Sequence, residues 1–154
     1  MARKALSEEE KLRSNKKQLG LTWAEIRSEI DANGGTLDKR VAVRGTSHTA
    51  RVIVRVRTAT YFFKWAMSIV VEPHGRIDGI DWEQTVRDHR GKAHNCTGWH
   101  RHMWKPASLD RHKECLQHFD PKSIKDFIVS GFEILNVQIK KGASSDASGK
   151  LPLD

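Results

Sequence analysis

The chain has 154 residues, 38% of them apolar and 30% charged, which is enough for one hydrophobic core but not for two. No apolar run approaches the roughly 18 residues of a membrane span, and no apolar stretch follows the basic N-terminus, so we expect neither a membrane protein nor a secretory signal. Lys and Arg outnumber Asp and Glu by 27 to 19, a net charge of +8 that favours a polyanionic partner such as nucleic acid. The alternative is a basic surface that binds no ligand. Two cysteines are too few for a disulfide scaffold, and we expect a cytoplasmic protein.

The first forty residues have the patterns of helices. Ser7–Glu10 has the Ser-x-x-Glu spacing of a capping box and predicts a first helix that ends at Gly20. Thr22–Glu25 repeats this spacing and predicts a second helix, closed by Asn33-Gly34-Gly35. The first helix is polar nearly all round, so we expect residues 1–46 to form a helical arm that buries little by itself.

A change of period marks the first strand. Residues 51–57 alternate basic and branched side chains, as a strand with one buried face does. The inward side chains are Val52, Val54 and Val56. The side chains of the other face are Arg51, Arg55 and Arg57.

Three further strands are predicted after it, over residues 61–72, 76–82 and 97–104, with a charged loop over residues 86–96. Residues 108–118 are expected to form a short helix.

Asp120-Pro121 is a strong start signal for a C-terminal helix. Its apolar stripe is Ile124, Phe127, Ile128, Phe132 and Leu135. Residues 140–154 have no core-forming pattern and are expected to be disordered. The sequence therefore predicts an α+β fold: two N-terminal helices, then a core domain over residues 47–139. This domain has a twisted antiparallel sheet of about four strands with the C-terminal helix packed across it.

Histidines gather in the second half of this domain: His89, His94, His100, His102, His112 and His118. On a strand, His100 and His102 project from one face about 7 Å apart, and Arg101 projects from the other. Two imidazoles with a pKa near 6.5 can serve as base and acid in phosphodiester cleavage, and a nearby cation can stabilise the charge on phosphorus. RNA supplies its own nucleophile, the 2′-hydroxyl, so this chemistry requires no metal or cofactor. The candidate catalytic residues are His94, His100, Arg101 and His102. The candidate nucleic-acid-binding residues are Arg51, Arg55, Arg57, Arg90 and Lys92.

Two alternatives remain open for this segment. Cys96-x3-His100-x-His102 and His112-x2-Cys115-x2-His118 have chelating separations, but they match no standard zinc motif. The histidines could also be ordinary strand and surface residues, with buried and inert cysteines. Of the flanking tryptophans, Trp99 is expected in the core, and a tryptophan on a basic sheet can stack on a base.

A turn and strand at Gly75-Arg76-Ile77-Asp78, a basic loop and the element Gly98-Trp99-His100-Arg101-His102 together resemble the TumE-type bacterial toxins of toxin–antitoxin pairs. Residues 119–127 are similar to the closing helix of that family, and the resemblance covers roughly residues 50–138. It implies a compact antiparallel sheet with a packed helix, a growth-inhibiting action and an antitoxin protein as partner.

Two functions follow as hypotheses. The first is a toxin-like, metal-independent endoribonuclease that acts on RNA through a histidine pair. The second is a non-catalytic module that binds nucleic acid or protein through its basic face. One version of this hypothesis is that a phage or mobile element encodes the module. Only the enzyme requires the histidines, because phosphate contacts are made by Lys and Arg.

Overall fold

The computed structural model describes residues 8–56, 64–72, 74–83, 98–105 and 110–141. Within these ranges the helices are α1 (Glu8–Ser14), α2 (Trp23–Ala32) and α3 (Ile124–Leu135). The strands of the main sheet are β2 (Thr36–Ala42), β3 (Thr49–Arg55), β4 (Ala66–Val71), β5 (Gly75–Glu83), β6 (Gly98–Lys105) and β7 (Asp110–Cys115). Two short strands, β1 (Lys17–Gln18) and β8 (Val137–Gln138), form a separate parallel pair.

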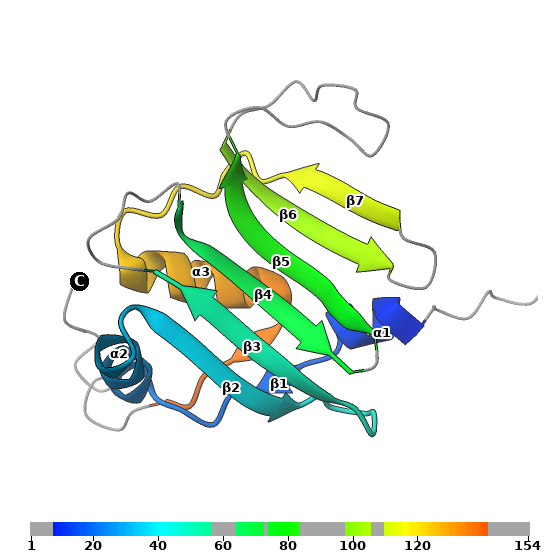
Figure 1. Cartoon of the computed structure of the whole chain (residues 1–154), viewed down its shortest axis with the longest axis horizontal. Coiled ribbons are helices and arrows are strands. Elements are labelled where there is room, and N and C mark those ends of the chain that lie inside the picture. The colour runs from blue at the N-terminus through cyan, green and yellow to red at the C-terminus, as the bar shows by residue number, and fades with distance from the viewer. Residues whose placement is uncertain (1–7, 57–63, 73, 84–97, 106–109, 142–154) are drawn as a thin grey trace, which may run out of the picture.

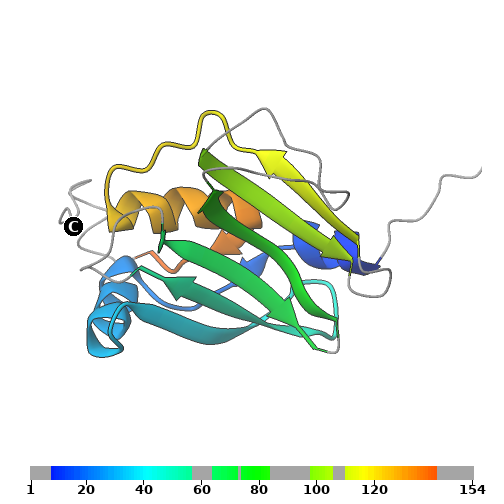
Figure 2. The same ribbon diagram turned by 45° about the horizontal axis from the view of Figure 1, so that its top comes forward.

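The strands β2 to β7 follow one another across the sheet in chain order, and every neighbouring pair is antiparallel. Figures 1 and 2 show α3 lying across one face of this sheet, which we call the core face. No helix of the described ranges lies across the other face, which we call the helix-free face. The predicted α+β class with an antiparallel sheet is confirmed.

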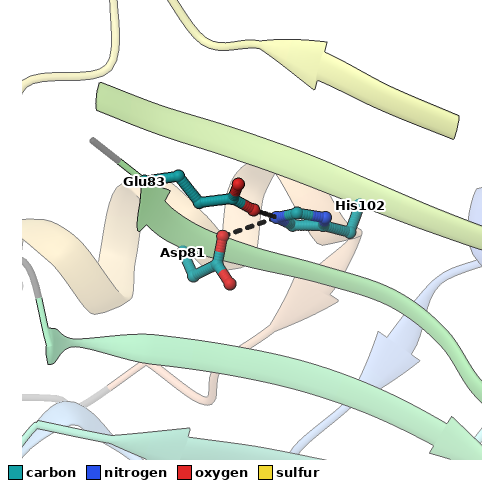
Figure 3. A group of neighbouring side chains, drawn as sticks. All are labelled: Asp81, Glu83 and His102. Atoms are coloured by element: carbon teal, nitrogen blue, oxygen red, sulfur yellow. Dashed lines mark hydrogen bonds and ion pairs between the residues drawn. The ribbon is translucent and has the colours of Figure 1, made fainter. Parts of the chain in front are cut away.

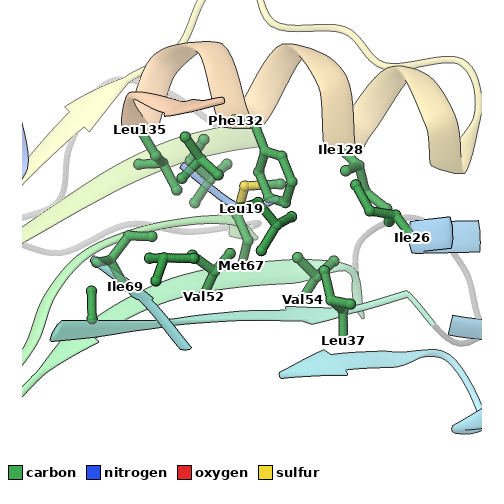
Figure 4. Close-up of a cluster of buried hydrophobic side chains, with 14 of the residues drawn as sticks. Leu19, Ile26, Leu37, Val52, Val54, Met67, Ile69, Ile128, Phe132 and Leu135 are labelled. Carbon is green, nitrogen blue, oxygen red and sulfur yellow. The ribbon is translucent and has the colours of Figure 1, made fainter. Parts of the chain in front are cut away.

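Alternation along β3 and β4 builds the core face. Val52 and Val54 of β3 and Ile69 of β4 are fully buried, and Met67 of β4 is 2% exposed. All four side chains lie beneath α3 (Figure 4). Burial of branched side chains on one face of a pleated strand sends the alternate residues to the other face. The predicted orientation of the valines is confirmed, and Arg51 and Arg55 occupy the helix-free face.

The apolar stripe predicted for the C-terminal helix is also confirmed, because all five of its residues are buried in α3. The helix begins later than Asp120-Pro121 indicates. Ser123 is the N-cap, with an extended backbone and a side chain that accepts a hydrogen bond from Asp126 N. This bond satisfies one of the free N–H groups of the first turn, so the cap fixes the start at Ile124.

The second predicted helix is confirmed as α2, with the Thr22–Glu25 capping box at its start and Asn33 as its C-cap. The first predicted helix ends at Ser14 and not at Gly20. Lys17 explains the early end: its buried ammonium donates to the carbonyl oxygens of Arg13 and Asn15 at 3.0 Å and of Leu135 at 3.2 Å, and so caps α1 and α3 together.

The main sheet has six described strands and not about four as expected. One addition lies within the arm that was expected to be helical, after the end of its second predicted helix, and the other replaces a predicted helix. β2 falls inside the expected helical arm of residues 1–46, and it pairs along its whole length with β3. β7 replaces the helix expected over residues 108–118 and pairs with β6. In both cases a neighbouring strand supplies hydrogen-bond partners that local propensity does not reveal. The arm also contributes to the core through Leu12 of α1 and Ile26 of α2, which are fully buried.

Several expectations concern residues outside the described ranges: the loop over 86–96, Arg57, and the tail from residue 142 onward. Among the residues that the structure describes, no helix has the length and apolar character that a membrane crossing requires.

Candidate active site

Strands β5 and β6 carry the candidate site, and their register decides which side chains meet. His100 lies opposite Asp81, and His102 lies opposite Gly79. Because side chains alternate along both strands, His100, His102, Asp81 and Glu83 all belong to the helix-free face. The prediction that the two histidines share a strand face is confirmed, with ring centroids 6.5 Å apart.

His102 is the centre of a hydrogen-bonded cluster (Figure 3). Its Nε2 lies 2.5 Å from Oδ1 of Asp81 and 2.9 Å from Oε1 of Glu83. Carboxylate oxygens only accept hydrogen bonds, so Nε2 must carry a hydrogen. The His102 side chain is 3% exposed, whereas Glu83 is 23% and Asp81 is 42% exposed. Asp81 is therefore the member of the cluster that solvent reaches most freely.

Strand β7 adds a cation. Lys113 lies opposite His102 in the register and donates from Nζ to Oε2 of Glu83 at 3.3 Å. Glu83 thus uses one oxygen for the imidazole and the other for the ammonium. The Lys113 side chain is 8% exposed, so its charge is little screened by solvent.

His100 lies beside this cluster but is fully buried. Its Nδ1 is 2.7 Å from the carbonyl oxygen of Gly98, an acceptor, so Nδ1 carries the hydrogen in the neutral ring. Burial is the main cause that lowers the pKa of His100, because it disfavours the charged imidazolium. Nε2 lies 3.8 Å from Sγ of Cys115, which is disulfide-bonded.

Trp104 packs against the imidazole of His102, with ring centroids 5.4 Å apart and the planes 19° from parallel. The Arg76 guanidinium lies 5.2 Å from the centroid of the same indole. These contacts hold the His102 ring in place. Trp104 therefore supports the site, and its stacking surface is already used within the protein.

Arg101 projects to the core face, apart from the two histidines. Its Nε and Nη2 donate to the two carboxylate oxygens of Asp78 at 3.0 and 2.8 Å, and Asp78 is completely buried. This hydrogen bonding raises the pKa of Arg101. Trp99 also lies on the core face, as predicted, 5.1 Å from Phe127 between ring centroids.

The predicted nucleic-acid contacts are only partly described. Arg51 is paired with Asp38 on the neighbouring strand and Arg55 is exposed, both on the helix-free face. His94, Arg90, Lys92 and Arg57 lie outside the described ranges.

Asp81, Glu83 and His102 are also a conceivable metal-ligand set, because one donor atom of each lies within 4.8 Å of the others. A metal on Nε2 would move the ring hydrogen to Nδ1, which is buried and has no hydrogen-bond partner among the described residues. Histidine ligands ordinarily donate that second N–H to an acceptor. The donor set therefore fits the observed hydrogen-bonded cluster better than a metal centre. The zinc alternative needs a thiolate that disulfide-bonded Cys115 does not provide.

Sequence reasoning identified the histidines but missed Asp81, Glu83 and Lys113. The signal for the carboxylates was present in the spacing of Asp81, within the strand predicted over residues 76–82, and Glu83, directly after it. It identifies a site only when β6 is known to be the neighbouring strand.

No family model matches this chain, and no curated protein or solved structure is detectably similar to it.

Proposed function

We propose that this protein cleaves RNA phosphodiester bonds without a metal ion, by proton transfer at the cluster of Asp81, Glu83 and His102. One observation carries the proposal: a nearly buried imidazole donates its Nε2–H between two carboxylate oxygens at 2.5 and 2.9 Å. A carboxylate–imidazole pair of this kind holds the ring in one tautomer and one orientation. The resemblance to TumE-type toxins remains a prediction, and it adds an antitoxin protein as a partner.

In the proposed reaction the Asp81 carboxylate accepts the proton of a 2′-hydroxyl. The 2′-oxygen then bonds to the adjacent phosphorus, and the bond from phosphorus to the 5′-oxygen breaks. The accepted proton passes to that 5′-oxygen, which leaves a 2′,3′-cyclic phosphate and a 5′-hydroxyl. Lys113 offers the positive charge that stabilises the negative charge on the phosphoryl oxygens in the transition state. His102 holds Asp81 and shares its proton, while fully buried His100 has the smaller role.

The test is incubation of the purified protein with single-stranded RNA, and with DNA of the same sequence, in EDTA. We expect only the RNA to be cut. Asp81→Asn and His102→Gln should each lower turnover by roughly 10²–10⁴. His118→Ala is the matched control, because His118 is exposed and outside the cluster. Thermal melts must show that each variant folds.

A folded Asp81→Asn protein with wild-type turnover would refute the proposal. RNA left intact across pH 5–8 would favour the second candidate, a binding module without catalysis. Three arginines support this alternative, because they are exposed on the helix-free face while the two imidazoles of that face are buried. They are Arg40, Arg55 and Arg76.

A further inference from the structure

A second polar site lies at the opposite side of the helix-free face, in a groove of about 260 Å³. Its lining residues are Arg40, Ser47, His48, Thr49, Arg51, Val70 and Glu72, and we call it the β2–β3 groove. Arg40, Arg51 and Val70 are register partners on β2, β3 and β4. The groove therefore belongs to the same sheet surface as the His102 cluster.

Two like charges meet in this groove. Arg40 lies directly opposite Arg51, a placement that destabilises a sheet unless a counter-charge is near. Asp38 accepts hydrogen bonds from Nε and Nη2 of Arg51, and these bonds raise the pKa of Arg51. Arg40 has no ion pair within the described part of the chain, and Glu72 is the carboxylate that lines the groove itself. The Arg40 guanidinium is thus the group whose charge a bound external anion would neutralise.

We propose that the β2–β3 groove binds a phosphate group of the RNA substrate, remote from the bond that is cut. A guanidinium presents parallel N–H donors that match two phosphate oxygens, and the hydroxyls of Ser47 and Thr49 add neutral donors. This inference rests on the proposed function. Strands lie about 4.8 Å apart, so β3 and β6 are separated by roughly 14 Å across the sheet. The groove lies at the level of Arg76, and the five residue steps from Arg76 to Asp81 on β5 add roughly 16 Å along the strands. A few nucleotides of RNA cover that distance, past Arg76 on β5.

The experiment measures binding separately from cleavage. A 2′-O-methylated single-stranded RNA lacks the attacking hydroxyl and cannot be cut by the proposed reaction. Its dissociation constant is measured by fluorescence anisotropy over a series of salt concentrations, with wild type, Arg40→Gln, Asp81→Asn and the control Arg27→Gln. Arg27 is on α2 and pairs with Asp31, so its variant makes the same charge change elsewhere.

We expect Arg40→Gln to raise the dissociation constant 3- to 10-fold, and to reduce the slope of log affinity against log salt by about 0.7. Arg27→Gln should leave that slope unchanged, and Asp81→Asn should bind at least as tightly as wild type, because it removes a negative charge beside the RNA. A wild-type slope for Arg40→Gln, or an equal effect of Arg27→Gln, would overturn the groove assignment while cleavage stands. Conversely, an Asp81→Asn protein that still cuts RNA removes the proposed catalysis, and a selective loss of binding by Arg40→Gln would still support the groove.

Discussion

Arg101→Met tests whether Arg101, which lies between the two histidines in sequence, stabilises the fold or takes part in catalysis. The Arg101 guanidinium pairs with fully buried Asp78 on the core face, and its side chain is 18% exposed. Removing one partner of a buried pair leaves an uncompensated charge and costs about 3–5 kcal/mol. Lys17 also attracts Asp78, so we expect the lower end of that range.

For a chain of this length, 1 kcal/mol shifts the melting temperature by about 2–4 °C, so Arg101→Met should lower it by about 10 °C. Urea unfolding followed by circular dichroism gives the free energy directly. Any RNA cleavage should persist at temperatures where the variant is folded, because Arg101 does not contact the His102 cluster. The double variant Asp78→Leu/Arg101→Met should recover part of the loss, because it removes the unpaired carboxylate; the rest stays, since buried Lys17 loses a nearby counter-charge and Gly79 N loses its acceptor.

Arg51→Met is the matched control. Arg51 pairs with Asp38 across β2 and β3, as Arg101 pairs with Asp78 across β5 and β6, but both partners are about 40% exposed. Solvent screens such a pair, and we expect a much smaller loss of stability. Equal losses for the two variants would refute the reasoning from burial. A stable Arg101→Met protein without activity would return Arg101 to the catalytic group.

Three further predictions follow from single contacts. Burial lowers the pKa of Lys17 to about 8, below its value in the unfolded chain, so the unfolded state binds more protons between pH 8 and 10.5. Stability should therefore rise over this window by at most ~1.4 kcal/mol per pH unit, and urea unfolding of Lys17→Met should lack this contribution. Gly79→Ala should destabilise the fold by about 1–3 kcal/mol, because its Cβ would lie 2.8 Å from the Met67 carbonyl oxygen; an unchanged melting temperature would contradict this. Ser123→Ala removes the N-cap of α3 and should cost about 1 kcal/mol in chemical unfolding, whereas Ser123→Asp should retain stability.

Local patterns in the sequence determined the elements that depend on near neighbours. Thr22 and Glu25 cap α2 as their spacing predicts, and the alternation at Val52 and Val54 fixes the two faces of β3. The stripe through Phe127 and Ile128 sets the buried side of α3. In each case the signal lies within a few residues, because helix capping and side-chain periodicity are properties of a short segment.

Tertiary structure decided what depends on pairing between distant segments. Thr36–Ala42 and Asp110–Cys115 become strands because β3 and β6 offer them hydrogen-bond partners. The same pairing of β5 with β6 places Asp81 and Glu83 beside His102, and sends Arg101 to Asp78 on the other face. Sequence alone predicted that His100 and His102 project from the same face of one strand. It could not supply their partners, because a register between strands is fixed by the packing of the whole sheet.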